Sequence, residues 1–390
     1  FNQALLLDLT DPTGGTCADP SSNGATSGCA PINIFGQGNI SAAGAAYLRT
    51  AVAAAVNFDQ EIYSASLAGD LFELPGGVIG AAVGYEHIEN EFSFRPSQDL
   101  AAGTIAGFNG SAASAGRTSV ESFFGELYLP LLRDAPMAHE LDLELAFRTS
   151  DYSSVGGVDS YKIAGSWAPI EMVRFRAGFN TAVRAPSIGE LFSPANEGFP
   201  GATDPCAAEG APDAATIAIC TATGVPAGQV NTPAINLPAG QVRAVGGGNP
   251  LLNEEEAETL TIGVVITPTF VEGLTFSIDH FDIEIEEYIA TFGGGANNIL
   301  NICYDPTSPF GGAGSQFCNV VNRRADGTID FIATSAQNVA VQTLKGWDVL
   351  ASYNTELLGG DFQVSYVGTF TEEHDFEPFA GATVISCDGQ

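Results

Sequence analysis

The chain has 390 residues, of which 45% are hydrophobic and 9% aromatic, and its formal net charge at pH 7 is −33. This composition is too apolar and too aromatic for a disordered chain. The excess of 46 acidic over 13 basic residues argues against binding to nucleic acid or to anionic lipid through a basic surface. The length allows two or three soluble domains or one large β-barrel.

No run of about 18 apolar residues occurs, so the sequence predicts no transmembrane helix. The Ala-rich stretch 42–56 comes nearest, but Arg49 interrupts it, and a short surface helix is expected there. The chain starts at Phe1 without a signal-peptide pattern, which suggests an internal section of a longer polypeptide.

Apolar and polar residues alternate strictly over segments of roughly ten residues, which is typical of membrane-spanning strands. In HELDLELAFR (139–148), the leucines and the phenylalanine share one face, and acidic residues and the arginine share the other. A further short strand near 327–335 is expected in a loop hairpin. The predicted long strands lie in two blocks, about 58–183 and 256–373: 58–73, 77–94, 118–131, 139–152, 159–168, 172–183, 256–267, 273–288, 339–355 and 361–373.

A soluble β-sandwich also alternates, but its strands are usually five or six residues long. Here the runs are longer, and their polar faces carry Arg, Lys and Glu beside small residues, which suits a wet or plugged lumen. In the segment 273–288 the apolar phase changes between Ile278 and Phe281. This change predicts either a β-bulge or a strand that leaves the membrane.

The connections differ in length at the two ends of the predicted strands. Turn-like links occur at 74–77, 133–138, 168–171, 267–273 and 357–360, and long polar segments occur at about 1–57, 96–117, 184–255 and 289–338. Short periplasmic turns and long extracellular loops are typical of outer-membrane barrels.

Six of the seven cysteines form close pairs in loop-like sequence, whereas metal sites usually show tighter C-x₂-C clusters with nearby histidines. We therefore expect disulfides that staple loops in an oxidising compartment. The predicted pairs are Cys17–Cys29, Cys206–Cys220 and Cys303–Cys318, with Cys387 left over to pair beyond Gln390.

No catalytic constellation is visible, and we expect neither an enzyme nor a cofactor. Ser187 lies outside a G-x-S-x-G motif. GGGNP (246–250) lacks the Lys-Ser/Thr of a phosphate loop and predicts a flexible loop. The acidic run from Asp279 to Glu287 could bind Ca²⁺, but it lacks the D-x-D-x-D-G pattern, and a strand would place its carboxylates on opposite faces.

Several segments resemble the TonB-dependent outer-membrane receptor family. FNTAVRAPSIGELFSP (179–194) resembles the junction at which a barrel strand leaves the membrane, and GGGNPLLNEEEAETLTIGVVITP (246–268) resembles the element that re-enters it. GLTFSIDHFDIEIEEYI (273–289), CAPINIFGQGNIS (29–41) and LKGWDVLASYNTEL (344–357) resemble further barrel elements in the family's order.

The resemblance implies an all-β, transmembrane antiparallel β-barrel, with residues 1–390 forming the central part of a 22-stranded wall around a plug. The plug and the closing C-terminal strands are absent from this sequence. The junction is expected to end a strand and anchor a loop, because Pro186 cannot donate to a β-ladder. Its residues are Arg184, Ala185, Pro186, Ser187, Glu190, Leu191 and Phe192.

Four cations on the polar phase of neighbouring strands are expected to face the lumen and the plug. Charges in such places need partners, which we expect to be acidic plug residues or acidic neighbours on adjacent strands, unless the lumen solvates them. These cations are Arg148, Lys162, Arg174 and Arg176.

The function that the resemblance implies is import of a scarce nutrient through the outer membrane of a Gram-negative bacterium. The ligand would be a ferric siderophore, haem, cobalamin or an oligosaccharide, with Tyr304 and Phe199 as possible stacking platforms. The expected partners are the TonB complex, acting through the plug, and the lipid and lipopolysaccharide of the membrane. A passive outer-membrane pore and a secreted β-rich adhesin or lectin remain the alternatives.

Overall fold

The structure is a computed structural model that describes residues 37–357 and 359–387. The predicted pair Cys17–Cys29 lies outside these residues. Two compact units are present: residues 37–56 and 94–113 form the described part of one, and residues 57–93 and 114–387 that of the other. Each unit is described below by itself.

The first unit contains two short helices, α2 (Ala42–Leu48) and α3 (Gln98–Ala101). The Ser41 side chain caps α2 by accepting a hydrogen bond from the Gly44 N–H at 3.0 Å, which satisfies one of the free donors at a helix start. The Ala-rich stretch thus forms the short helix that the sequence predicts. Among the described residues, no helix has the length and hydropathy of a membrane span.

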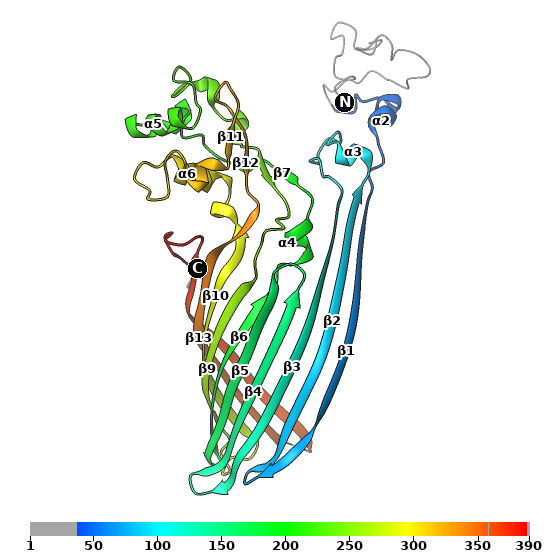
Figure 1. The fold of residues 1–390 in the computed structure, drawn as a ribbon, viewed down its shortest axis with the longest axis vertical. Helices are drawn as coiled ribbons and strands as arrows, with labels where there is room; N and C mark the ends of the chain where they lie inside the picture. The colour runs from blue at the N-terminus through cyan, green and yellow to red at the C-terminus, as the bar shows by residue number, and fades with distance from the viewer. Residues whose placement is uncertain (1–36, 358, 388–390) are drawn as a thin grey trace. The chain divides into compact units, whose positions relative to one another are not determined.

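The second unit is dominated by an antiparallel sheet (Figure 1), whose strands follow the chain order apart from short strands in the loops. Its order is β1-β2-β3-β4-β5-β6-β9-β10-β13-β14-β15. The ten long strands overlap the ten alternating segments of the sequence. The bounds are β1 Ala54–Leu74, β2 Gly77–Pro96, β3 Ser114–Ala135, β4 Ala138–Tyr152, β5 Gly156–Ile170, β6 Val173–Arg184, β9 Glu255–Ile266, β10 Leu274–Thr291, β13 Ala336–Leu357, β14 Gly360–Glu377 and β15 Ile385–Ser386.

The two faces of this sheet differ, as the strand alternation requires. One side, here called the outer face, exposes large apolar side chains, among them Phe147, Ile163, Phe175 and Ile262. The opposite side, the inner face, carries the charged residues of the same strands. A hollow over the inner face is lined by residues from Tyr128 in β3 to Thr369 in β14, so this face is concave.

Both tryptophans of the chain lie on the outer face and satisfy their indole N–H groups. Trp167, near the turn end of β5, donates to the Met137 carbonyl at 2.9 Å and stacks on Phe175 with 5.6 Å between ring centroids. Trp347 in β13 donates to Glu372 at 2.9 Å. Aromatic residues with one apolar and one polar end favour the borders of an apolar band.

The phase change in β10 involves no bulge. Pairing of β10 with β9 is regular from Phe276 to Glu286, and the register shift against β13 comes later, between Ile285 and Tyr288. Of the two predicted explanations, the structure therefore excludes a bulge between Ile278 and Phe281.

Instead, the two faces exchange character beyond Ile278. On the outer face, Lys345 pairs with Asp282 at 3.6 Å and with Glu373 at 3.7 Å. On the inner face, Phe281 lines the hollow. A charged outer face at this level is what is expected where a strand has left an apolar surrounding.

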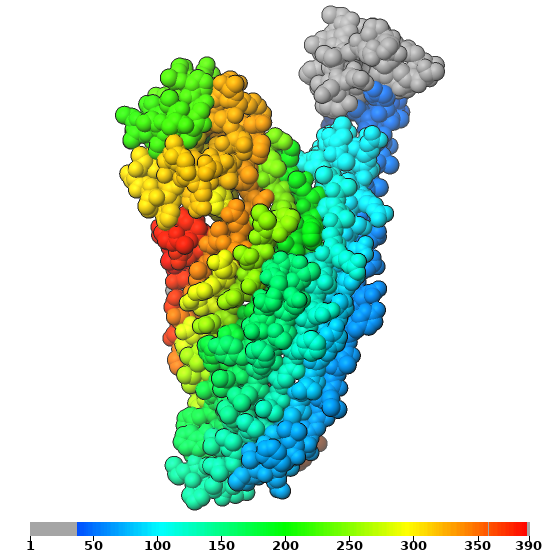
Figure 2. Space-filling model, in the orientation of Figure 1, coloured from blue at the N-terminus to red at the C-terminus, as the bar shows by residue number. Residues whose placement is uncertain are grey.

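The long connections of the sheet are folded and contain α4 (Ile188–Phe192), α5 (Ala214–Ala222), α6 (Ala296–Tyr304) and α7 (Gln316–Asn319). They also contain a small sheet of order β11-β12-β8-β7, with β7 Asn196–Gly198, β8 Ala244–Gly246, β11 Val321–Arg323 and β12 Ile329–Ala333. The strand expected near 327–335 is β12. Figures 1 and 2 show α5, α6, β11 and β12 gathered at one end of the long strands.

Candidate functional site: the inner face and the rim

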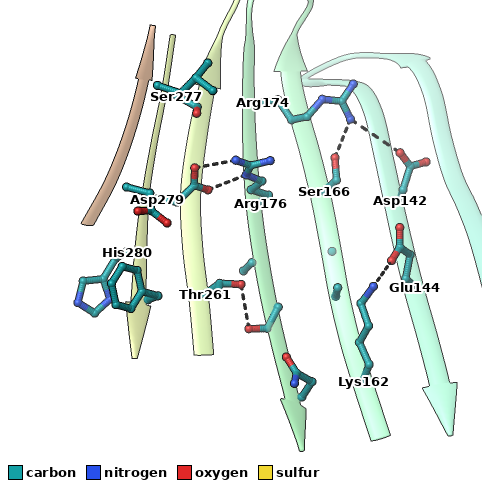
Figure 3. A pocket seen from close by; sticks show the side chains of 18 of the residues that line it. Asp142, Glu144, Lys162, Ser166, Arg174, Arg176, Thr261, Ser277, Asp279 and His280 are labelled. Carbon is teal, nitrogen blue, oxygen red and sulfur yellow. Dashed lines mark hydrogen bonds and ion pairs between the residues drawn. The ribbon is translucent and has the colours of Figure 1, made fainter. Parts of the chain in front are cut away.

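All four cations that were expected to face a lumen have their register positions on the inner face of the sheet. Lys162, Arg174 and Arg176 line the same hollow, of about 1070 Å³, and Arg148 lies on the same phase of β4. Figure 3 shows how the side chains of neighbouring strands reach toward one another across this face. Each cation has an acidic partner within the wall.

Arg176 in β6 forms a bidentate ion pair with Asp279 in β10, with two N–O distances of 2.6 Å (Figure 3). The pair spans the intervening strand β9 above Gly263, which is the register partner of both residues. A Cβ atom at Gly263 would lie 1.8 Å from the Asp279 Oδ1 atom. Glycine is therefore required here because the ion pair occupies the space of a side chain.

Arg174 belongs to a cluster near the turn end of the sheet. It donates to the Ser166 hydroxyl at 2.7 Å and forms an ion pair with Glu140. Arg133 adds contacts to Glu140 at 3.3 Å and to Asp142 at 2.7 Å. Asp142 is only 6% exposed, and the two guanidinium groups compensate its charge.

The other two cations are paired in the same way. Lys162 binds Glu144 on the adjacent strand at 2.7 Å, and Arg148 binds Glu86 in β2 at 2.6 Å while lying 5.9 Å from the Phe124 ring centroid. Acidic residues of the wall thus provide partners for all four cations. Three of the partners lie two strands away, because a long Arg side chain can cross an intervening strand.

The inner face also carries polar groups that can meet water or a bound molecule. Asp348 accepts a hydrogen bond from Thr369 at 2.6 Å and lies opposite Asp279 in the sheet register. Asp279 itself is engaged by Arg176, whereas Asp282, Glu284 and Glu286 lie on the opposite, outer phase of β10. In the described part of the chain, no group of three or more His, Cys, Asp or Glu is arranged to hold a metal ion.

The rim of the sheet is built around Arg184, the last residue of β6. Its guanidinium binds Glu190 at 2.9 and 3.1 Å and Glu255 at 2.7 Å, and Glu255 is only 5% exposed. Ser187 and Glu190 form a capping box at the start of α4, in which each side chain accepts from the other residue's backbone N–H. The Arg-Ala-Pro-Ser junction therefore ends a strand and starts a helix at one point.

The Gly-Asn-Pro element packs against this helix and is not a flexible loop, contrary to the sequence-based prediction. A Cβ atom at Gly248 would lie 2.4 Å from the Leu191 carbonyl oxygen, so the glycine allows close backbone approach. Leu191 and Leu252 are buried together with Ile289, and Phe192 packs against them. A run of glycines in the sequence is compatible with a flexible loop and with close backbone packing, and the residues that pack against it in space decide between the two.

The two predicted disulfides within the described residues are confirmed, Cys206–Cys220 and Cys303–Cys318. All four cysteines are buried, with exposed fractions of at most 6%. Cys387 is a free, exposed cysteine in this chain.

Tyr304 is not a stacking platform for a ligand. It is 2% exposed, and its hydroxyl accepts from Arg323 at 3.0 Å and lies 3.1 Å from the Thr223 hydroxyl. Tyr304 is buried because it lies on the side of α6 that packs into a core shared with α5. Phe199, by contrast, is 47% exposed.

Comparisons with known proteins identify similar barrels. A family model described as TonB dependent receptor-like, beta-barrel matches residues 12–384. No curated protein sequence matches the chain significantly.

Three of the similar solved structures are two siderophore receptors and a peptide transporter. A mutant of the ferric enterobactin receptor PfeA from Pseudomonas aeruginosa is 16% identical, with 82% of this chain and 36% of that chain covered and a TM-score of 0.47. The siderophore receptor PirA from Acinetobacter baumannii is 12% identical, with coverages of 82% and 38% and a TM-score of 0.44. The RagAB peptide transporter is 10% identical, with coverages of 85% and 31% and a TM-score of 0.48. The chain thus spans between 31% and 38% of the length of these three structures.

Proposed function

Because the chain belongs to the TonB-dependent receptor family, whose β-barrel model covers residues 12–384, we propose that it is the central wall of an outer-membrane nutrient importer. The family consists of receptors and transporters and not of enzymes. The barrels of this family are outer-membrane proteins. In this proposal the outer face meets lipid, and the inner face meets a plug.

The observation that carries the proposal is the family match over a sheet whose two faces differ in polarity. The outer face exposes large apolar residues together with Trp167 and Trp347, and the inner face carries a network of paired charges. A wall between lipid and water needs this division, because an unpaired charge facing lipid costs several kcal/mol.

The proposed cycle follows from the family. A ligand is captured by the extracellular loops and the outer end of the plug, and TonB then acts on the plug with energy from the inner membrane. The wall performs no bond chemistry, and its contribution is to hold the loops and to line the path. Candidate ligands are a ferric siderophore, haem, cobalamin or an oligosaccharide, and lipopolysaccharide is a proposed neighbour of the outer face.

The test compares growth of the native cell with and without the full-length receptor, under limitation of one nutrient at a time. We expect a growth defect in one condition, and we expect inactivation of TonB to reproduce it. A passive pore would support uptake at the same rate without TonB. An adhesin or lectin would leave uptake unchanged in every condition.

A further inference from the structure

The two longest connections between strands in the described part of the chain share one hydrophobic core. Eighteen buried residues form it: seven come from the segment 206–242, ten from the segment 292–332, and the last is Phe379. Each disulfide closes within one loop, but the residues around it pack on the other loop. The apolar residues of the two loops are therefore buried against each other.

A buried ion pair joins the same two loops. Arg323 binds Asp204 through two N–O contacts of 2.7 and 2.8 Å, and the two side chains are 3% and 0% exposed. Arg323 also donates to Tyr304 and to the Gly327 carbonyl. A buried charge without its partner is strongly destabilising, so the loops must be ordered together for this pair to form.

A third segment, which follows β14, completes the core. Phe379 is 7% exposed and lies between Phe310 and Phe317, with ring centroids 5.0 and 4.8 Å away. Phe317 in turn stacks on Phe292 at 5.0 Å. We call the body formed by residues 199–245, 291–334 and 378–382 the cap, and Figure 2 shows its green, yellow and orange parts in contact.

Side-chain amides join the segments that enter and leave the cap at the rim of the sheet. The Asn338 side chain donates to the carbonyls of Asn253 and Glu287 at 2.9 Å each and accepts from the Asn253 N–H at 2.8 Å. The Asn249 side chain donates to the Ala336 carbonyl at 2.9 Å. These bonds connect the tops of β10 and β13 with the chain that enters β9.

Each glycine run at the two connections contains a closely packed glycine. A Cβ atom at Gly293 would lie 2.6 Å from Ile299, and one at Gly248 would lie 2.4 Å from the Leu191 carbonyl oxygen. Large backbone rotations at these points would require the core or α4 to separate first. The cap and the rim are therefore coupled through close packing.

We propose that the cap is a single cooperative unit that is already folded before a ligand binds, and that it forms a fixed wall of the ligand entrance. The role at the ligand entrance rests on the proposed function, whereas the cooperative folding does not. Loop closure on capture, where it occurs, then belongs to segments outside the cap. A set of independently moving loops would instead become ordered one at a time.

Hydrogen exchange followed by mass spectrometry on the ligand-free, full-length receptor tests this proposal. We expect slow exchange in α5 and α6 without any ligand, because both helices belong to the shared core. In the variant Cys303→Ala/Cys318→Ala, exchange should become at least about tenfold faster in α5 as well, which corresponds to about 1.4 kcal/mol. Phe379→Ala is a milder variant with the same expected spread, and Cys387→Ser is the matched control that changes neither helix.

Peptides from β4 report in the same experiment whether the sheet itself has stayed folded. Faster exchange confined to 291–334, with α5 unchanged, would show that the loops fold independently and would overturn the proposal. Rapid exchange of α5 and α6 in the unmodified receptor would do the same. Neither ligand nor TonB takes part, so a failure here leaves the import proposal to its own test.

Discussion

The sharpest test of the two-faced sheet is an arginine placed on each side of β4 at adjacent positions. Leu145 lies on the outer face between its register partners Leu127 and Ile163. It is four residues from Leu141, the partner of Trp167, and four residues from Thr149 on the other side. Four residues of an antiparallel strand rise about 14 Å, or about 10 Å in depth at a tilt of about 40°.

An arginine at Leu145 therefore has no polar neighbour on its face and no border within easy reach. We expect Leu145→Arg to lower the free energy of unfolding by about 2–4 kcal/mol. Ala146→Arg is the matched control, because Ala146 lies on the inner face opposite Glu126 and Lys162. Its cost should be clearly smaller, since water and Glu126 can meet the new charge.

The assay measures the free energy of unfolding of the full-length receptor in lipid vesicles by a reversible urea titration. Equal costs for the two variants would mean that the faces are wrongly assigned or that the outer face does not meet lipid. A larger cost for Ala146→Arg would contradict the reasoning entirely.

Three further variants address the loops. Arg323→Met should destabilise the cap by about 3–5 kcal/mol because it leaves Asp204 buried without its partner, and pairing it with Asp204→Leu should recover most of this loss, as limited proteolysis can show. Gly248→Ala should cost about 1–3 kcal/mol by overpacking against the backbone of α4, whereas Gly228→Ala, where a Cβ meets nothing within 4 Å, should be nearly neutral in thermal unfolding. A hydrogen bond from a backbone N–H of α5 lowers the pKa of Asp213 in the folded protein. The stabilisation of α5 by the Asp213 carboxylate is therefore complete above the pKa of Asp in the unfolded chain, and it is lost as the pH falls through the lower pKa of the folded state. Asp213→Asn should remove this pH dependence from the hydrogen exchange of α5.

The alternation of apolar and polar residues predicted the long strands well, because successive side chains of a strand point to opposite faces and the two faces of this sheet differ in polarity. The same pattern assigned Arg174 and Arg176 to the polar phase, and both line the hollow over the inner face. It could not identify Asp279 as the partner of Arg176, since the two residues are 103 positions apart and meet across β9. The sequence gives one hint of this ion pair, which is the isolated glycine Gly263 on the polar phase of an otherwise regular strand.

The loops were harder to predict because their core is assembled from segments far apart in the chain. The sequence analysis treated these segments as long polar connections, and the shared core combines residues of both loops. In retrospect, α6 carries a local signal, since Ile299, Leu300, Cys303 and Tyr304 share one side of a helix and are all buried. Recognition of that pattern would have placed Tyr304 inside the protein and not at a ligand.

The central claim, that this sheet separates lipid from water, is tested most directly by nitroxide scanning of positions 141–149 in the full-length receptor in lipid vesicles. The measured quantity is the accessibility of each label to oxygen, which enters lipid, and to a nickel chelate, which stays in water. We predict that both accessibilities oscillate with a period of two residues and out of phase, with oxygen maxima at 143, 145 and 147. Oscillation in phase, or a water-exposed signal at all three positions, would contradict the account.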